Sequence, residues 1–132
     1  MDNKRLGVRL AQETLLGINE LKKELVKDEI FQGIRITNGL VVSQAYLETK
    51  NFDKKTWEVV VKKNLNSFFD GDVHEKLNVV TNLYLEEDVI NGIMELKHVL
   101  VDLSILKVSY VTVSYAIRQM IKGYFLKRHG IL

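Results

Sequence analysis

The apolar and polar residues of the chain follow two periodicities in succession, and this succession occurs twice. Residues 4–10 alternate between polar or small residues and apolar ones, and residues 80–85 do the same. Alternation with a period of two is typical of a strand that buries one face. The side chains expected to face inward are Leu6, Val8, Leu10, Leu83 and Leu85. Those expected to face solvent are Arg5, Gly7, Arg9, Val80, Asn82 and Tyr84.

Two helices are predicted after each strand. The first has apolar residues three, three and four positions apart, which places them on one helix face. These residues are Leu15, Ile18, Leu21 and Leu25 after the first strand, and Ile90, Ile93, Leu96 and Leu100 after the second. The second helix is expected to begin at a favoured N-cap residue. The candidates are Thr37 or Asn38 in the first half, and Ser109 or Thr112 in the second.

A comparison of the two halves indicates an internal duplication. Residues 10–44 align without gaps with residues 85–119, a displacement of 75 positions, and eleven positions are identical. The identical residues of the first copy are Leu10, Gly17, Ile18, Glu20, Leu21, Lys22, Leu25, Val26, Ile30, Thr37 and Gln44. Chance would give roughly two or three identities at typical residue frequencies. Unrelated amphipathic helices match somewhat more often, which is the alternative explanation.

One strand–helix–helix unit leaves its strand unpaired and buries little apolar surface, so the two units are expected to complete each other. We predict a mainly α-helical single domain, residues 1–132, with a short two-stranded antiparallel β-ribbon packed on four helices. The two repeats, 4–50 and 78–128, would form a pseudo-dimer within one chain. Residues 51–77 are expected to be a helical connector. Its helix would begin near Asp53 and end at a turn at 70–72, with one apolar face formed by Trp57, Val60, Val61, Leu65 and Phe68 or Phe69.

The composition is that of an ordinary globular protein. The 132 residues include 19 basic and 17 acidic ones, a net charge of +2, and 46% are hydrophobic. The absence of cysteine excludes disulfides, thiol nucleophiles and thiolate metal sites. The most apolar stretch, Val99–Ile121, contains Asp102, Lys107 and Arg118, which are costly in a bilayer. With no signal peptide visible, a cytoplasmic protein without membrane association is expected.

No catalytic or metal-binding motif is visible. His74, His98 and His129 lack metal-ligand spacing, and the sequence contains no nucleotide-binding glycine loop. We therefore expect neither enzyme activity nor a metal or other cofactor. The basic residues near the C-terminus are expected to form a solvated helix end, with a contact to phosphate as the alternative. They are Lys122, Lys127, Arg128 and His129.

The two halves resemble the ribbon-helix-helix family of DNA-binding proteins. The resemblance rests on residues 4–10 with their following helix, on residues 82–89 as a second start, and on residues 108–125 as a second helix. It covers about 90–95 residues and is a pattern of residue types rather than of invariant residues. Two such units in a chain of this length resemble the TraY-type relaxosome proteins of conjugative plasmids.

The resemblance implies that the ribbon enters the major groove of double-stranded DNA and reads base edges. The base-reading positions would be Arg5, Gly7, Arg9, Val80, Asn82 and Tyr84. Arginine can pair with guanine through two hydrogen bonds, and asparagine with adenine. The family also holds backbone phosphates at the start of the second helix. The phosphate-binding residues would be Lys4, Thr37, Asn38, Ser109 and Thr112.

The expected function is therefore sequence-specific DNA binding, as a relaxosome accessory protein at a transfer origin or as a transcriptional repressor. A relaxase or another DNA-processing protein is the candidate protein partner, and molecules on adjacent DNA sites are candidates for self-association. Two alternatives stay open. One is a helical protein-interaction module that uses Trp57, Phe68 and Phe69 as a partner-binding patch. The other is an antitoxin-type regulator.

The chain departs from the family pattern in four ways. Gly7 offers no side chain at the middle of its strand, and Ala11 and Glu86 are weak N-caps for the first helices. Strand and second helix are 27 positions apart in both halves, which requires either a longer first helix or a longer link. The alignment of the second helices can also slip by four positions, which would match Ala45 with Ala116.

Overall fold

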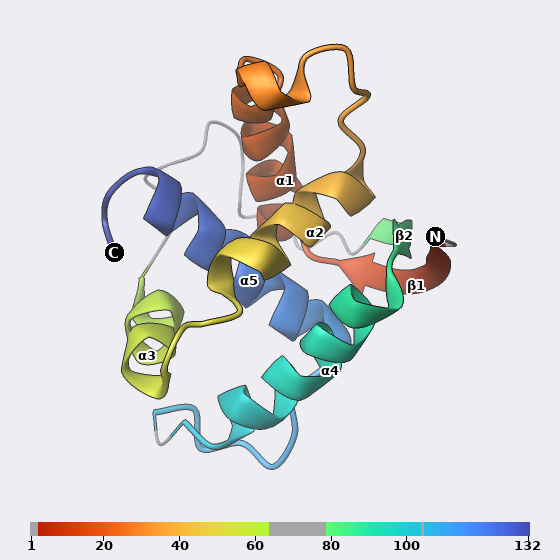
Figure 1. The fold of residues 1–132 in the computed structure, drawn as a ribbon. Helices are drawn as coiled ribbons and strands as arrows, with labels where there is room; N and C mark the ends of the chain where they lie inside the picture. The colour runs from red at the N-terminus through yellow and green to blue at the C-terminus, as the bar shows by residue number, and fades with distance from the viewer. Residues whose placement is uncertain (1–2, 64–78, 104) are drawn as a thin grey trace.

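The fold is that of a computed structural model, which describes residues 3–63, 79–103 and 105–132 (Figure 1). Within these ranges the chain forms five α-helices and one two-stranded antiparallel sheet, which confirms the mainly helical class with a β-ribbon. The elements in chain order are β1 (Lys4–Leu10), α1 (Gln12–Leu25), the short 3-10 helix η1 (Glu29–Phe31), α2 (Asn38–Thr49), α3 (Lys54–Lys62), β2 (Val79–Leu85), α4 (Glu87–Val101) and α5 (Val113–Arg128).

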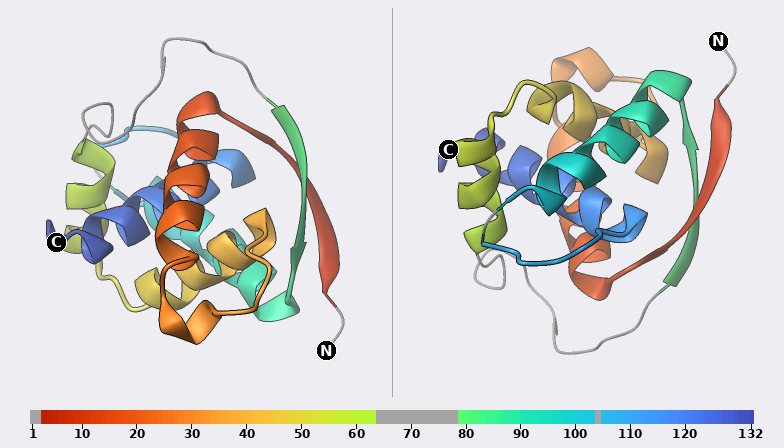
Figure 2. Two further views of the ribbon diagram at one scale, coloured as in Figure 1. Left: turned by 90° about the horizontal axis from the view of Figure 1, so that it is seen from above. Right: turned by 90° about the horizontal axis from the view of Figure 1, so that it is seen from below.

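The ribbon lies on one side of the helices, as the two views of Figure 2 show. β1 and β2 pair along their whole length, with Lys4 opposite Leu85 and Leu10 opposite Val79. The predicted alternation is confirmed, because Leu10, Leu83 and Leu85 are fully buried while the solvent-facing residues are exposed. Burial of one apolar face holds the ribbon against the helices.

Helix α5 is the central helix of the fold and contacts each of the other four α-helices as well as β1. Every residue from Gln119 to Leu126 is buried. The apolar faces predicted for α1 and α4 pack into the same core, which includes Ile18, Leu21, Leu25, Ile93 and Leu100 at 0% exposure. Because the chain contains no proline, which would break a helix interior, α5 can run uninterrupted through the core.

The 27 positions between each strand and its second helix are accommodated by a long link between the two helices. Of the two alternatives, a longer first helix or a longer link, the longer link is confirmed. α1 ends at Leu25, and η1 and a loop lead on to α2, while α4 ends at Val101 and a loop leads to α5. The Oγ1 atoms of Thr37 and Thr112 cap the two second helices, each accepting a backbone N–H at 3.1 Å. Helix α5 therefore begins after Thr112 and not at Ser109. The two caps match in the gap-free alignment, not in the slipped one.

The connector helix α3 begins as predicted. Asp53 caps it by accepting the backbone N–H and the hydroxyl of Thr56 at 2.8 and 2.7 Å, which holds the pKa of Asp53 below its usual value. Trp57 is 4% exposed and meets Phe52 edge to face, with 5.1 Å between ring centroids. Trp57 is thus part of the core and not of a surface patch. Leu65, Phe68, Phe69 and the turn at 70–72 lie outside the described residues.

The expected solvated end of α5 is wrong for Lys122. This side chain is 4% exposed, and its Nζ donates to the carbonyl oxygens of Val61 and Lys63 at 3.1 and 2.5 Å. These carbonyls lie at the C-terminal end of α3, where a cation is favourable. Burial lowers the pKa of Lys122 to about 8, against the attraction of Glu13. Lys122 therefore joins α3 to α5.

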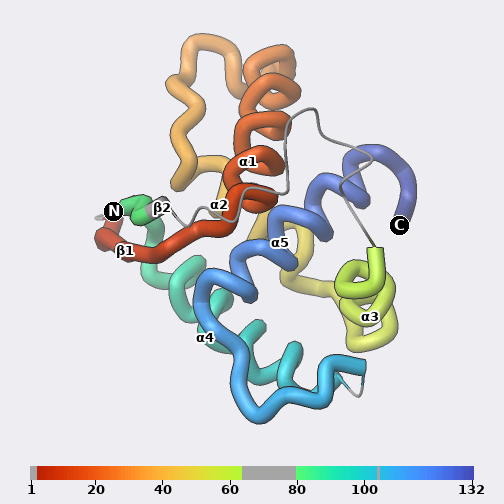
Figure 3. Tube along the Cα trace, turned by 180° about the vertical axis from the view of Figure 1, so that it is seen from behind, coloured from red at the N-terminus to blue at the C-terminus, as the bar shows by residue number. Residues whose placement is uncertain are grey.

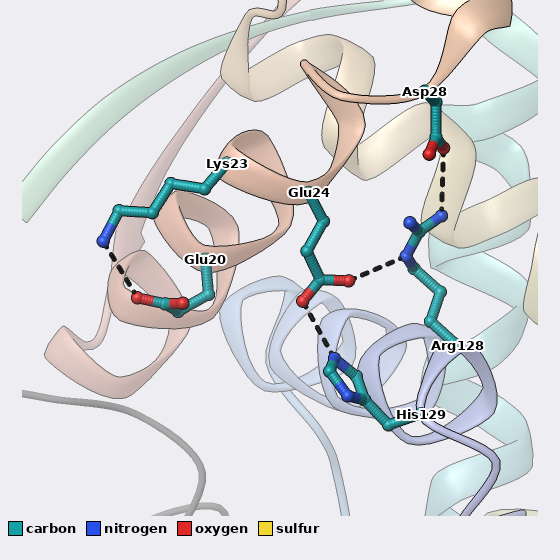
Figure 4. Close-up of polar contacts among 6 residues, drawn as sticks. All are labelled: Glu20, Lys23, Glu24, Asp28, Arg128 and His129. Carbon is teal, nitrogen blue, oxygen red and sulfur yellow. Dashed lines mark hydrogen bonds and ion pairs between the residues drawn. The ribbon is translucent and has the colours of Figure 1, made fainter.

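The last turn of α5 is also tied down, in a cluster of ion pairs with α1 (Figure 4). Arg128 Nε and His129 Nε2 lie 2.9 and 2.8 Å from the two carboxylate oxygens of Glu24. Arg128 Nη1 lies 3.4 Å from the carboxylate of Asp28, just beyond the end of α1. The His129 ring stacks on Phe125 at 4.1 Å. Arg128 and His129 thus connect α5 to the end of α1, and Lys127, Arg128 and His129 all remain exposed, as expected for a solvated helix end.

Candidate nucleic-acid interface

The outer face of the ribbon brings the six proposed base-reading positions together in three rows. Arg5 lies opposite Tyr84, Gly7 opposite Asn82, and Arg9 opposite Val80. All six positions are exposed, including Tyr84 at 58% and Val80 at 60%. Side chains directly opposite each other in an antiparallel pair lie about 5 Å apart. The face is therefore a compact strip with one arginine near each end and an amide in the middle.

Gly7 has a structural role in this strip. A Cβ atom at Gly7 would lie 3.4 Å from Oδ1 of Asn82, so the amide of Asn82 extends over the glycine. The empty position is thus covered by the side chain opposite. It leaves Asn82 at the centre of the face, where both its donor and its acceptor can reach a ligand.

Lys4 does not lie on this face. Lys4 and Arg5 are neighbours in β1, so their side chains point to opposite faces of the strand. The Nζ atom of Lys4 forms an ion pair with Oε1 of Glu87, at the start of α4, at 3.5 Å. Both side chains are more than 60% exposed, so the ion pair is weak. To bind a phosphate, the side chain of Lys4 would have to break its ion pair with Glu87.

The start of α2 lies directly against β2, beside the ribbon face. A Cβ atom at Gly39 would be 2.6 Å from the carbonyl oxygen of Tyr84, so only a glycine permits this approach. The first backbone N–H groups of a helix have no partner within the helix, and they carry the positive end of its dipole. Thr37 and Asn38 therefore bring an anion-attracting helix start next to Tyr84.

A groove of about 450 Å³ joins this helix start to the ribbon. Its walls contain Thr37, Asn38, Asn82 and Tyr84 together with two cations, Lys22 of α1 and Arg35 of the α1–α2 link. Sequence reasoning missed both cations, because nothing local in the sequence shows that they reach the ribbon. The one available signal was that Lys22 is identical to Lys97 in the gap-free alignment.

The start of α5 has a different character. Thr112 caps it, and exposed Ser109 lies in the loop before it. A larger groove of about 650 Å³ is lined by residues 106–112 and Tyr115, and Lys107 is the one charged residue among the described residues that line it. Burial raises the pKa of the Tyr115 hydroxyl above its usual value. At the positions that correspond to Arg35 and Gly39, this half has Tyr110 and Ser114. The two helix starts therefore offer unequal surfaces.

The described residues contain neither a cluster of metal ligands nor a membrane-spanning helix. No three of their histidine and carboxylate side chains come together in a way that could hold a metal ion, and His74 lies outside the described ranges. None of their helices is long and apolar enough to cross a bilayer.

Comparisons with known proteins add no family to this geometry. No protein-family model matches the chain, and neither a curated protein nor a solved structure gives a significant match.

Proposed function

We propose that this chain is a non-enzymatic, sequence-specific DNA-binding protein that inserts the β1–β2 ribbon into the major groove. The observation that carries the proposal is the register, which pairs Arg5 with Tyr84, Gly7 with Asn82 and Arg9 with Val80 on an exposed face. A two-stranded ribbon fits the major groove, and arginine and asparagine are the residues that read guanine and adenine there.

Support for phosphate binding comes from the surroundings of the ribbon. Helix α2 begins beside β2, with Lys22 and Arg35 lining the same groove as its cap residue Thr37. Helix α5 contacts β1 and begins after Thr112. A helix start on each side of the ribbon would face the two phosphate backbones that border the major groove.

We also propose that the chain is a tandem ribbon-helix-helix protein that arose by duplication. The element boundaries support this. β2 has the bounds of β1 displaced by 75 positions, and α4 and α5 begin 75 positions after α1 and α2. Within this proposal, residues 4–50 and 78–128 are the two repeats, and residues 51–77 connect them.

The ribbon has unlike halves, so its DNA site need not be palindromic. One strand offers two arginines and the other offers Val80, Asn82 and Tyr84. We propose a role as a relaxosome accessory protein at a transfer origin, with a relaxase as its protein partner, or as a transcriptional repressor. A selected site beside a relaxase nick site would favour the first role, and one within a promoter the second.

Selection of bound duplexes from a random library, followed by binding measurements across salt concentrations, tests the proposal. Arg5→Ala and Arg9→Ala should each weaken binding to the selected site by about 1–3 kcal/mol and relax preference at particular base pairs. Lys62→Ala, on α3 on the other side of the helices from the ribbon, is the matched control and should bind as the parent does (Figure 2).

Two results would contradict DNA binding by the ribbon. The first is affinity that does not change with salt, because phosphate contacts release counterions. The second is an equal loss for Lys62→Ala and for the ribbon variants. Absence of duplex binding even at low salt would instead favour a protein-interaction module.

A further inference from the structure

The exposed face of the β1–β2 ribbon carries its polar side chains in a fixed order. In β1, Arg5 and Arg9 lie two positions to either side of Gly7, and Gly7 is opposite Asn82 of β2. The order along the ribbon is therefore guanidinium, amide, guanidinium, here called the Arg–Asn–Arg line. Within the described ranges of the chain these three side chains form no ion pair or hydrogen bond, so their polar groups are available to a ligand.

The amide of the Arg–Asn–Arg line lies on the midline of the ribbon. Because Gly7 has no side chain, Asn82 extends across it, with Oδ1 only 3.4 Å from where a Cβ atom would be. At this level of the register Asn82 offers the one side chain, whereas each arginine has an exposed neighbour opposite, Tyr84 or Val80. A base pair that lies over the middle of the ribbon therefore meets an amide and not a cation.

Strand geometry sets the spacing of the line. Residues of an antiparallel strand rise about 3.4 Å each, so Arg5 and Arg9 lie about 13 Å apart along β1, with Asn82 halfway between them. Base pairs of B-DNA are stacked about 3.4 Å apart along the helix axis, and are slightly farther apart along the inclined groove. The two arginines therefore face base pairs that are three or four positions apart, and the amide faces a base pair between them.

The chemistry of each side chain gives its contact a base preference. A guanidinium group can donate two hydrogen bonds to O6 and N7 of guanine, and it has no acceptor for the amino group of adenine. An amide can accept from N6 of adenine and donate to its N7, whereas guanine would leave the amide oxygen without a partner. Each such pair discriminates against the wrong base by roughly 5- to 150-fold.

We propose that the ribbon selects a DNA core in which two G·C pairs, three or four positions apart, flank an A·T pair. Arg5 and Arg9 read the two guanines, and Asn82 reads the adenine. This inference rests on the proposed insertion of the ribbon into the major groove and adds which bases the ribbon selects there. The pattern needs both strands, because β1 has no residue that reads adenine and β2 has no arginine.

Selection of duplexes from a random library by the parent and by three variants tests the order of the bases. Arg5→Ala and Arg9→Ala should each lose preference at one G·C pair, and Asn82→Ala should lose it at an A·T pair between them, by about fivefold or more. Lys62→Ala, on α3 at the opposite edge of the molecule from the ribbon, should keep all three preferences (Figure 3). Circular dichroism establishes that each variant is folded.

Duplexes that contain 7-deazaguanine assign each arginine to its own guanine, because this base lacks the N7 acceptor and still pairs with cytosine. The parent should bind about fivefold more weakly when either selected guanine is replaced. Arg5→Ala should lose nothing further at the guanine that Arg5 reads and the full factor at the other guanine, and Arg9→Ala should show the reverse.

Three results would overturn the base assignment while leaving DNA binding in place. They are an A·T preference outside the interval between the two G·C pairs, arginine-dependent preferences at adjacent base pairs, and equal losses from 7-deazaguanine in the parent and both arginine variants. The last result would assign the arginines to phosphates. A parent protein that binds no duplex even at low salt would contradict the proposed function itself, and the base assignment with it.

Discussion

Two glycines fix where neighbouring elements can approach each other. At Gly39 the start of α2 meets the backbone of β2, and at Gly92 the ring of Tyr46 lies over α4, where a Cβ atom would be 2.0 Å from Cε1. A glycine within a helix lowers helix stability by about 1 kcal/mol relative to alanine. At each of these positions the lower stability accompanies a contact that a larger residue would not permit.

Gly92→Ala is expected to lower the free energy of unfolding by about 1–3 kcal/mol, because the new methyl group overlaps the Tyr46 ring. Urea denaturation measures the change. In a Tyr46→Ala background the same substitution should instead raise stability by up to about 1 kcal/mol, since only the helix preference of alanine remains. Destabilisation of the same size in both backgrounds would contradict the assigned clash.

Gly39→Ala should lower stability and also weaken duplex binding, because the added carbon would force α2 away from the carbonyl of Tyr84. The matched control for stability is Gly7→Ala, whose Cβ would meet only Asn82 Oδ1 at an ordinary 3.4 Å. That control should leave stability within about 0.5 kcal/mol of the parent, as ordinary surface substitutions do. A Gly39→Ala protein with the stability and DNA affinity of the parent would show that the close approach is not needed.

At the scale of elements, the ammonium group of Lys122 joins the end of α3 to α5. Its pKa in the folded protein, about 8, is below the ordinary 10.5 of the unfolded chain. Between these values the unfolded state binds more protons, so the free energy of unfolding should rise with pH, by about 2 kcal/mol from pH 8 to 10. Below about pH 7 both states are almost fully protonated, and Lys122 gives no slope.

Denaturation of the parent and of Lys122→Met across pH 7–10 checks this expectation. The variant should show no rise above pH 8. The raised pKa values of Tyr115 and Tyr124 lower stability from about pH 9 upward, and they do so equally in both proteins, so the difference between parent and variant isolates Lys122. An equal rise in both proteins would assign the effect to another group.

The elements themselves were largely predictable, because their determinants are local. Alternation at residues 4–10 and the cap residues Thr37 and Asp53 act within a few positions, and the observed strand and helices begin where these signals lie. The burial of Lys122 could not be predicted in this way. Its partners, the carbonyls of Val61 and Lys63, lie about 60 positions earlier, and a lysine near a helix end is most often solvated.

In the candidate site, too, local sequence signals predict some features, whereas others depend on contacts between residues far apart in the sequence. Its outward face follows from the period of two in each strand, whereas the pairing of Gly7 with Asn82 follows from the register between strands distant in the sequence. The two cations beside Thr37, Lys22 and Arg35, come from a helix and a link that only the tertiary packing brings to β2. Periodicity identifies which residues face outward but not which of them become neighbours.

At the scale of the whole molecule, each half of the chain needs the other. β1 has its only described strand partner in β2, and α5 packs against α1, α2 and α3 of the first half. Fragments 1–63 and 78–132, prepared separately, should therefore show little cooperative unfolding alone, because each exposes an unpaired strand and an apolar face.

Mixing the two fragments should restore a 1:1 complex with a cooperative thermal transition, measured by circular dichroism and sedimentation. The midpoint should depend on concentration in the fragments but not in the intact chain. A fragment that unfolds cooperatively on its own as a monomer would contradict the mutual dependence of the halves.

The distance in sequence between the paired strands also has a consequence for synthesis on the ribosome. About 70 residues separate the end of β1 from the start of β2. At about 5–20 residues per second, β1 waits several seconds for its partner to be translated. During that interval the inner face of β1 and the core side of α1, with Leu10, Ile18 and Leu21, are uncovered. The nascent first half is therefore expected to be a chaperone client, and slower translation of the intervening codons would lengthen its exposure.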